Sequence, residues 1–291
     1  MKATLAQNLR GAVLMIAAMG AFRGNDAAMK AVLQDLPFSQ AVFLRGLCAT
    51  LLLFVIAWRS GALAALPRGR DRRAVALCVT GEMGSTLTYL TAIALVPLSV
   101  AVAILQGVPL ILTIAGALLF GETVGWRRWI AVFVGLAGVL MIIQPGADGF
   151  NVMSLLVVAT VFCIALRDLA ARSLTAAVPS QVMALITGAM VTLLALVLSI
   201  GSDWVMPTPG QSVIIVTAAV LVSLAYIFAV SAIRAGDVGF VAPFRYSGLL
   251  WAAALGILLF GERPGPWQLT GAAIVVATGL FILHRERVAA R

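Results

Sequence analysis

Residues 99–120 read SVAVAILQGVPLILTIAGALLF, a stretch of 22 residues without a charged side chain. An α-helix rises 1.5 Å per residue, so about 20 apolar residues cross the hydrocarbon core of a bilayer. Nine other windows of similar length and character fall near 9–29, 38–58, 74–95, 126–144, 151–171, 180–200, 211–233, 238–260 and 266–284. We therefore expect an all-α, polytopic membrane protein with ten transmembrane helices.

The composition of the whole chain supports this reading. Of 291 residues, 62% are hydrophobic and 11% are charged, and the mean hydropathy is +1.09. Soluble domains carry about 25% charged residues, so a chain this apolar could not cover its surface in water. The first window runs directly into Arg23 without a convincing cleavage site, so we expect a retained helix rather than a signal peptide.

The basic residues behind the net charge of +9 are unevenly divided between the two sides of the membrane. If the N-terminus is cytoplasmic, fourteen basic residues fall on the cytoplasmic side, and Lys30 and Arg263 fall on the other. The fourteen are Lys2, Arg10, Arg59, Arg68, Arg70, Arg72, Arg73, Arg127, Arg128, Arg172, Arg234, Arg285, Arg287 and Arg291. This positive-inside bias predicts a multi-pass protein of the cell (inner) membrane with both termini in the cytoplasm. The basic charge is then explained by orientation, and no nucleic-acid partner is expected.

The chain contains an internal repeat. A shift of 142 residues aligns Asp26-x-x-x-Lys30 with Asp168-x-x-x-Arg172, Pro37 with Pro179 and Gly46 with Gly188, and a shift of 140 aligns Phe120-Gly121-Glu122 with Phe260-Gly261-Glu262. Each half holds five spans, an odd number, so the second half must enter the membrane from the opposite face. The sequence thus predicts two inverted five-helix repeats, residues 1–146 and 147–291, as in many secondary transporters. A duplicated scaffold or enzyme is the alternative.

These motifs carry a family resemblance. The segment Phe22–Lys30, the pattern Pro37-x-x-Gln40-x-x-x-x-Arg45 and the two Phe-Gly-Glu turns resemble the drug/metabolite transporter superfamily, in its ten-helix type with two EamA domains. The resemblance covers nearly the whole chain and implies a transporter whose central cavity is lined by helices one to four and six to nine. It also implies that helices five and ten lie outside, where they would support a homodimer surrounded by membrane lipids.

Several ionisable residues fall inside the predicted spans. Each costs at least about 2.5–3.5 kcal/mol in hydrocarbon, so we expect each to face a cavity or a partner. Arg23 and Asp26 are spaced i,i+3, and Asp168 and Arg172 are spaced i,i+4, so a purely structural neutralisation is one reading. The equivalence of Asp26 and Asp168 in the two halves favours the other reading. It predicts a gating or helix-tethering group formed by Arg23, Asn25, Asp26, Arg167 and Asp168.

A second group of polar residues predicts a substrate pocket at the midplane. Glu82, Thr86 and Tyr89 share one helical face at i, i+4 and i+7. The full set of expected cavity residues is Arg45, Glu82, Thr86, Tyr89, Gln106, Thr113, Ser223, Tyr226, Arg245 and Trp251, although simple packing also explains Trp251. Arg45, Glu82 and Arg245 have no partner on their own helix, which suggests that they pair with one another across the cavity.

The embedded charges sum to one excess positive charge, which favours a substrate with a carboxylate, because an arginine fork binds it bidentately. An amino acid or organic acid fits best, and Glu82 is the candidate for proton coupling or amine binding. The chain has one histidine, His284, and no phosphate-binding loop of the Gly-x-x-x-x-Gly-Lys-Ser/Thr type. We therefore expect no enzyme, no cofactor and no metal site.

The favoured function is a secondary transporter that exports or exchanges a small polar metabolite by alternating access. An importer of a vitamin-like or nucleoside-like solute, a flippase for lipid-linked groups and a channel remain as alternatives. Glycines in helix five (Gly135, Gly138) and in helix ten (Gly271, Gly279) permit close helix contact, either within one protomer or between two.

Overall fold

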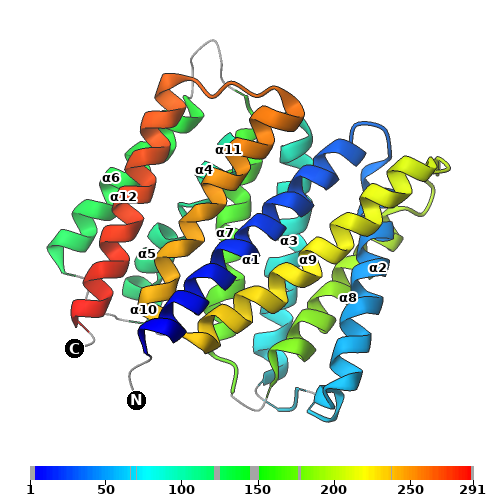
Figure 1. Ribbon diagram of the computed structural model, residues 1–291, viewed down its shortest axis with the longest axis horizontal. Helices are drawn as coiled ribbons and strands as arrows, with labels where there is room; N and C mark the ends of the chain where they lie inside the picture. Colours follow the sequence, from blue (N-terminus) through cyan, green and yellow to red (C-terminus); the bar gives the residue numbers. More distant parts are fainter. Residues whose placement is uncertain are drawn as a thin grey trace.

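The computed structural model describes residues 4–65, 67–69, 71–120, 125–144, 151–175, 178–236 and 238–289. Every regular element in these ranges is helical, which confirms the predicted fold class (Figure 1). The elements are α1 (Leu5–Val32), α2 (Phe38–Arg59), η1 (Ala62–Ala64), α3 (Asp71–Leu95), α4 (Leu98–Leu105), α5 (Val108–Phe120), α6 (Trp126–Ile143), α7 (Ser154–Arg172), α8 (Ser180–Leu198), α9 (Pro209–Ala235), α10 (Val238–Val241), η2 (Ala242–Tyr246), α11 (Ser247–Phe260) and α12 (Pro266–Ala289).

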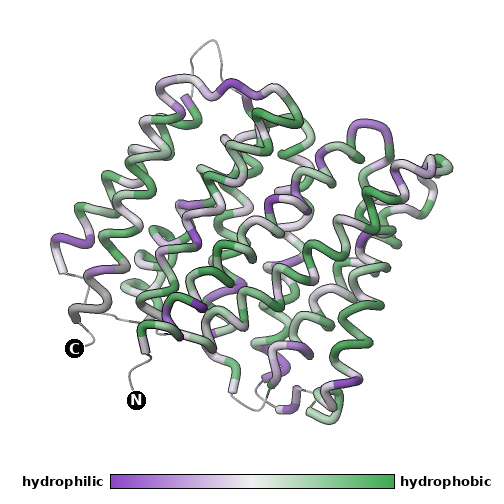
Figure 2. Tube along the Cα trace, in the orientation of Figure 1, coloured by the Kyte–Doolittle hydropathy of each residue, from purple (hydrophilic) through white to green (hydrophobic). Residues whose placement is uncertain are grey.

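These elements make the ten predicted spans. In the described part of the chain, 8 helical segments are long and apolar enough to cross a membrane. The other two spans are α3, which carries charged residues at its start, and α12, whose apolar part is Pro266–Ile282. Figure 2 shows hydrophilic residues mainly at the ends of the helices and at a few positions inside the bundle.

Prolines set several helix starts and two irregular spans. The helices α2, α4 and α8 begin directly after Pro37, Pro97 and Pro179. Proline has no backbone N–H to donate to a preceding helical turn, so it is accepted at the start of a helix but not in its interior. The fourth span breaks between α4 and α5 at Gln106 and Gly107, close to Pro109. The ninth span begins with α10 and the 3₁₀ segment η2 around Pro243 before it continues as α11.

The packing of the two halves follows a two-fold relation. The helix α1 packs along α9, α3 along α7, α2 along α8 and α6 along α12. If the first half is exchanged for the second, the α1–α9 pair becomes the α7–α3 pair, and the α2–α8 and α6–α12 pairs map onto themselves. Both chain ends lie at the same end of the bundle in Figure 1, as an even number of spans requires.

Individual side chains repeat this relation where α2 crosses α8. Gly46 lies against Thr192, and its counterpart Gly188 lies against Thr50. The two threonine hydroxyl oxygens are 3.1 Å apart and share a hydrogen bond. The residues aligned by the 142-residue shift therefore meet each other reciprocally, which supports the inverted repeat. The predicted boundary between residues 146 and 147 lies outside the described residues, as do Gly121 and Glu122, and that boundary stays a prediction.

The pair α6 and α12 forms one edge of the bundle, opposite the edge formed by α2 and α8 (Figure 1). A Cβ atom on Gly271 would lie 2.6 Å from the carbonyl oxygen of Gly138, and one on Gly135 would lie 2.8 Å from Thr278 Oγ1. These glycines thus let α6 and α12 approach within one protomer. Gly279 instead faces the ring of Tyr246. The homodimer stays a prediction.

Substituting Gly271 with alanine is expected to lower the free energy of unfolding by about 1–3 kcal/mol, because the new methyl group meets a backbone oxygen that cannot rotate away. The matched control is Gly210→Ala near the start of α9, where nothing lies within 4 Å of the added carbon. The control should be neutral or slightly stabilising. Thermal unfolding of the purified variants in detergent checks both, and equal melting temperatures for the two variants would contradict the packing argument.

Candidate functional site

The interior charges form two networks between the ends of the bundle. We call the end at which both termini lie the terminal end, and the end at which α1 finishes the Lys30 end. By the positive-inside bias, the Lys30 end is predicted to face outward.

The first network, the α1 network, consists of Arg23, Asn25, Asp26, Arg45 and Tyr89. Arg23 Nη1 lies 2.7 Å from Asp26 Oδ2 and donates to the Tyr89 hydroxyl at 3.1 Å. The Tyr89 hydroxyl donates to Asp26 Oδ2 at 3.0 Å, and the Asn25 amide donates to Asp26 Oδ1 at 3.1 Å. Arg45 Nη1 donates to Asn25 Oδ1 at 3.3 Å. The predicted Arg23–Asp26 pair is thus present, and the network around it links α1 to α2 and α3.

The second network, the α7 network, consists of Glu82, Arg167, Asp168 and Tyr226. Arg167 Nη1 lies 2.7 Å from Glu82 Oε2, and Arg167 Nη2 lies 2.9 Å from Asp168 Oδ1. The Tyr226 hydroxyl donates to Glu82 Oε1 at 3.2 Å. Glu82 belongs to the first half, whereas its partners come from α7 and α9, so this network joins the two halves.

Arg45, which bonds to Asn25 of the α1 network, also lies near enough to Glu82 and Tyr226 of the α7 network to interact with them electrostatically. Among the described residues it has no carboxylate within ion-pair distance, and its Nη1 donates to the Asn25 amide oxygen. The ring of Phe22 meets that of Tyr226 edge to face at a centroid distance of 5.3 Å, which also brings α1 and α9 together at this level.

Three buried N–H donors lack an acceptor among the described residues. They are Arg23 Nε, Arg45 Nε and Gln106 Nε2. Arg23 Nε faces Gly248 of α11, since a Cβ there would lie 3.7 Å from this nitrogen. Gln106 lies at the break between α4 and α5. A buried donor without a partner is destabilising by about 1–3 kcal/mol, so three of them on helices of the first half indicate places for acceptor atoms.

Other predicted cavity residues belong to neither of the two networks. Thr113 and Ser223 are buried and donate to carbonyl oxygens of their own helices, Pro109 at 2.9 Å and Ala219 at 2.8 Å. Thr86 is half-buried on α3. Trp251 is 41% exposed, and its ring lies against Gly20 of α1.

One sequence-based interpretation was wrong. Arg45, Glu82 and Arg245 do not pair with one another, because Glu82 binds Arg167 and Tyr226, and Arg245 is exposed on η2. The expected pairing assumed a regular α-helix through the ninth span. That span instead begins with a 3₁₀ segment, which changes the angle between successive side chains.

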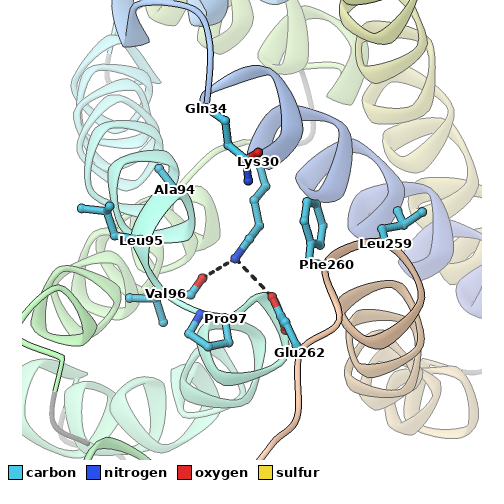
Figure 3. Close-up of a pocket in the computed structure, with 9 residues that line it drawn as sticks. All are labelled: Lys30, Gln34, Ala94, Leu95, Val96, Pro97, Leu259, Phe260 and Glu262. Carbon is cyan, nitrogen blue, oxygen red and sulfur yellow. Dashed lines mark hydrogen bonds and ion pairs between the residues drawn. The ribbon is translucent and has the colours of Figure 1, made fainter.

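The sequence reading also missed a buried contact at the Lys30 end. Lys30 Nζ lies 3.1 Å from Glu262 Oε1 and donates to the Val96 carbonyl oxygen at 2.6 Å (Figure 3). Both charged residues belong to motifs that repeat in the two halves, Asp-x-x-x-Lys and Phe-Gly-Glu. Their recurrence was a signal for importance, but nothing in the spacing predicted that the two motifs meet.

Ten helical spans in two inverted halves, with ion pairs inside the bundle, define a multi-pass membrane transporter as the class of protein. The chain belongs to the EamA-like transporter family, whose model matches residues 9–144 and again 151–284. Both halves of the chain are therefore family domains, and proteins of this family are transporters rather than enzymes.

Relatives with assigned names differ in cargo and direction. The chain is 26% identical over 197 residues to an S-adenosylmethionine uptake transporter of Rickettsia bellii, covering 68% of this chain and 67% of that protein. It is 31% identical over 192 residues to a riboflavin transporter of Vibrio cholerae, covering 66% and 64%. It is 27% identical over 285 residues to a pseudopaline exporter of Pseudomonas aeruginosa, covering 95% and 97%.

A solved crystal structure superposes on 96% of this chain and 98% of its own chain with a TM-score of 0.62. Its sequence identity of 19% makes this a likeness of fold alone.

Proposed function

We propose that this protein is a secondary transporter that moves a small polar metabolite with a carboxylate, an amino acid or a related acid, across the inner membrane. It works as an exporter or exchanger by alternating access, with both termini in the cytoplasm and with helices α6 and α12 available for a homodimer contact. The observation that carries the proposal is Arg45, a half-buried residue whose buried Nε has no acceptor and whose guanidinium has no carboxylate partner among the described residues.

The chemistry of the unsatisfied donors supports an anionic substrate. Arg45 Nε, Arg23 Nε and Gln106 Nε2 can only donate, so each needs an acceptor. A carboxylate offers two oxygens with about four acceptor sites and can meet an arginine bidentately. A substrate carboxylate at Arg45 would thus satisfy its Nε and neutralise its charge in one step.

The α7 network supports alternating access. Like the Lys30–Glu262 pair, it spans both halves, so a rocking of one half against the other would have to break or rearrange the Glu82–Arg167 contact. Both oxygens of Glu82 are engaged by Arg167 and Tyr226. The release of these partners would free Glu82 to take a proton or a substrate amine, in keeping with the role proposed for it.

A counterflow assay in proteoliposomes tests the substrate class. Vesicles are loaded with unlabelled amino acids, organic acids, riboflavin or nucleosides, and the entry of each labelled counterpart is measured. We expect saturable exchange of one or more carboxylate-bearing solutes above protein-free vesicles, because the bound carboxylate supplies the acceptors that Arg45 lacks.

Other outcomes of this assay contradict the proposal. Exchange restricted to uncharged vitamin-like or nucleoside-like solutes would favour an importer of that kind, and a riboflavin transporter is among the relatives. Non-saturable flux would indicate a channel. Movement of labelled lipid-linked groups alone would indicate a flippase.

A further inference from the structure

The turn Phe260-Gly261-Glu262 belongs to the second half of the chain and contacts the first half at the Lys30 end. Gly261 adopts a left-handed conformation with φ of 62°, which ends α11, and Glu262 N donates to Gly256 O at 3.0 Å. The turn folds the Glu262 carboxylate back over Gly256, where a Cβ atom would collide with it. Two glycines therefore aim this carboxylate at the first half of the molecule.

The carboxylate caps α4 of the first half. Leu98 N donates to Glu262 Oε1 at 2.6 Å, and Ser99 donates to Oε2 through its backbone N at 3.2 Å and its hydroxyl at 3.0 Å. A carboxylate at a helix N-terminus satisfies N–H groups that have no partner within the helix, and it meets the positive end of the helix dipole. The N-cap residue of α4, Pro97, makes no side-chain cap of its own.

Lys30 completes the joint from α1. Its ammonium group bonds to Glu262 and to the Val96 carbonyl oxygen, and it lies 5.2 Å from the centre of the Phe260 ring (Figure 3). Within the Phe-Gly-Glu motif, the phenylalanine makes a cation–π contact with Lys30 and the glutamate makes an ion pair with it. The glycine between them reverses the chain direction. The side chains of Lys30 and Glu262 are 9% and 7% exposed.

Exposure of the interior charges increases away from this joint. The side chains of Arg23 and Asp26 are 15% and 9% exposed, whereas those of Glu82, Arg167 and Asp168 are 17%, 28% and 27% exposed. On the other side of the joint lies an open cavity of about 460 Å³, lined by Lys30, Gln34, Ala94–Pro97, Leu259, Phe260 and Glu262. Lys30 and Glu262 of the joint form part of the wall of this cavity (Figure 3).

We propose that Lys30, Glu262 and the first turn of α4 form a latch that closes the transport path at the Lys30 end. This inference rests on the proposed transport by alternating access. When the latch opens, α4 and α11 separate, Lys30 and Glu262 become hydrated, and α4 loses its cap. The interactions within the latch therefore set how strongly the closed state is favoured over the state that is open at this end.

A thiol-labelling experiment tests the latch without a substrate. Cys48, Cys78 and Cys163 are first replaced by serine, and Ala103→Cys is added as the reporter. Ala103 is 3% exposed and lies one turn deeper than Ser99 on the same face of α4. A membrane-impermeant thiol reagent is applied from the Lys30 end, and Gln34→Cys, in the wall of the cavity, identifies that side by its rapid labelling.

In this background, Glu262→Gln and Lys30→Met are each expected to raise the labelling rate of the reporter by at least about tenfold, because one partner of a buried ion pair is removed. Lys30→Arg should keep the slow rate. The matched control is Arg263→Gln, which changes the exposed neighbour of Glu262 and should leave the rate unchanged.

An unchanged rate in both Glu262→Gln and Lys30→Met would overturn the latch, provided that Gln34→Cys labels normally and the variants elute as one gel-filtration peak. If one variant fails to fold, the other decides the question. The labelling needs no cargo, so a failed counterflow assay with faster labelling would reject the proposed substrate class and keep the latch. Normal counterflow with unchanged labelling would do the opposite.

Discussion

Replacement of Arg45 by methionine is expected to abolish counterflow of a carboxylate substrate and, at the same time, to stabilise the protein without substrate. Loss of a charge that pairs with a buried ligand charge costs about 2–5 kcal/mol, or about three-hundredfold in affinity at the middle of this range. In the empty protein, however, the Arg45 guanidinium lacks a carboxylate partner within the described residues and leaves Nε unsatisfied. An apolar side chain of similar length removes that desolvation cost.

The measurements are the initial rate of counterflow and the thermal unfolding of the purified protein with and without substrate. Arg23→Met is the matched control, because Arg23 pairs with Asp26 at 2.7 Å. This control should lower stability, since it leaves a buried carboxylate without its partner. The interpretation of Arg45 fails if Arg45→Met unfolds at a lower temperature than the unchanged protein, or if it retains counterflow.

Arg167→Met is expected to give the largest loss of stability among the interior substitutions, about 3–5 kcal/mol. Arg167 is bonded to two carboxylates, Glu82 at 2.7 Å and Asp168 at 2.9 Å. Its removal leaves two like charges close together in the membrane interior, with the Tyr226 hydroxyl as the remaining donor to Glu82 among the described residues. Thermal or denaturant unfolding in detergent measures the loss.

A second substitution tests whether the loss comes from the orphaned carboxylates. Glu82→Gln in the Arg167→Met background removes one of the two charges, so it should recover part of the lost stability. Glu82→Gln alone should be destabilising, because it breaks the bond to Arg167. The expected result is therefore strong non-additivity, as is typical of residues in one network. Additive effects of the two substitutions would contradict the network.

The spans were predictable because hydrophobic length and charge are local properties of the sequence. The pair Arg23–Asp26 was predictable for the same reason, since residues at i,i+3 share a helix face. The partner of Glu82 was not, because Arg167 is separated from it by 85 residues and lies on a helix of the other half. Which helix packs against which depends on the three-dimensional arrangement of the bundle, and a single sequence does not contain it in readable form.

Local irregularity also limited the prediction. The expected pairing of Arg245 with Glu82 presupposed a regular helix in the ninth span, whereas residues 242–246 are 3₁₀ and Arg245 is exposed. Lys30 and Glu262 were seen as members of repeated motifs, but their contact joins α1 to the turn after α11. The sequence thus shows which residues recur in the two halves, but not which of them are in contact.

The mutual contact of Thr50 and Thr192 has a consequence for how such a chain can arise. When equivalent residues of two related units meet each other, the interface is isologous, the kind by which identical subunits close into a pair. A five-helix polypeptide with this patch could associate with a second copy of itself inserted upside down. The single chain then has the geometry of an antiparallel homodimer whose two subunits have been fused and have diverged.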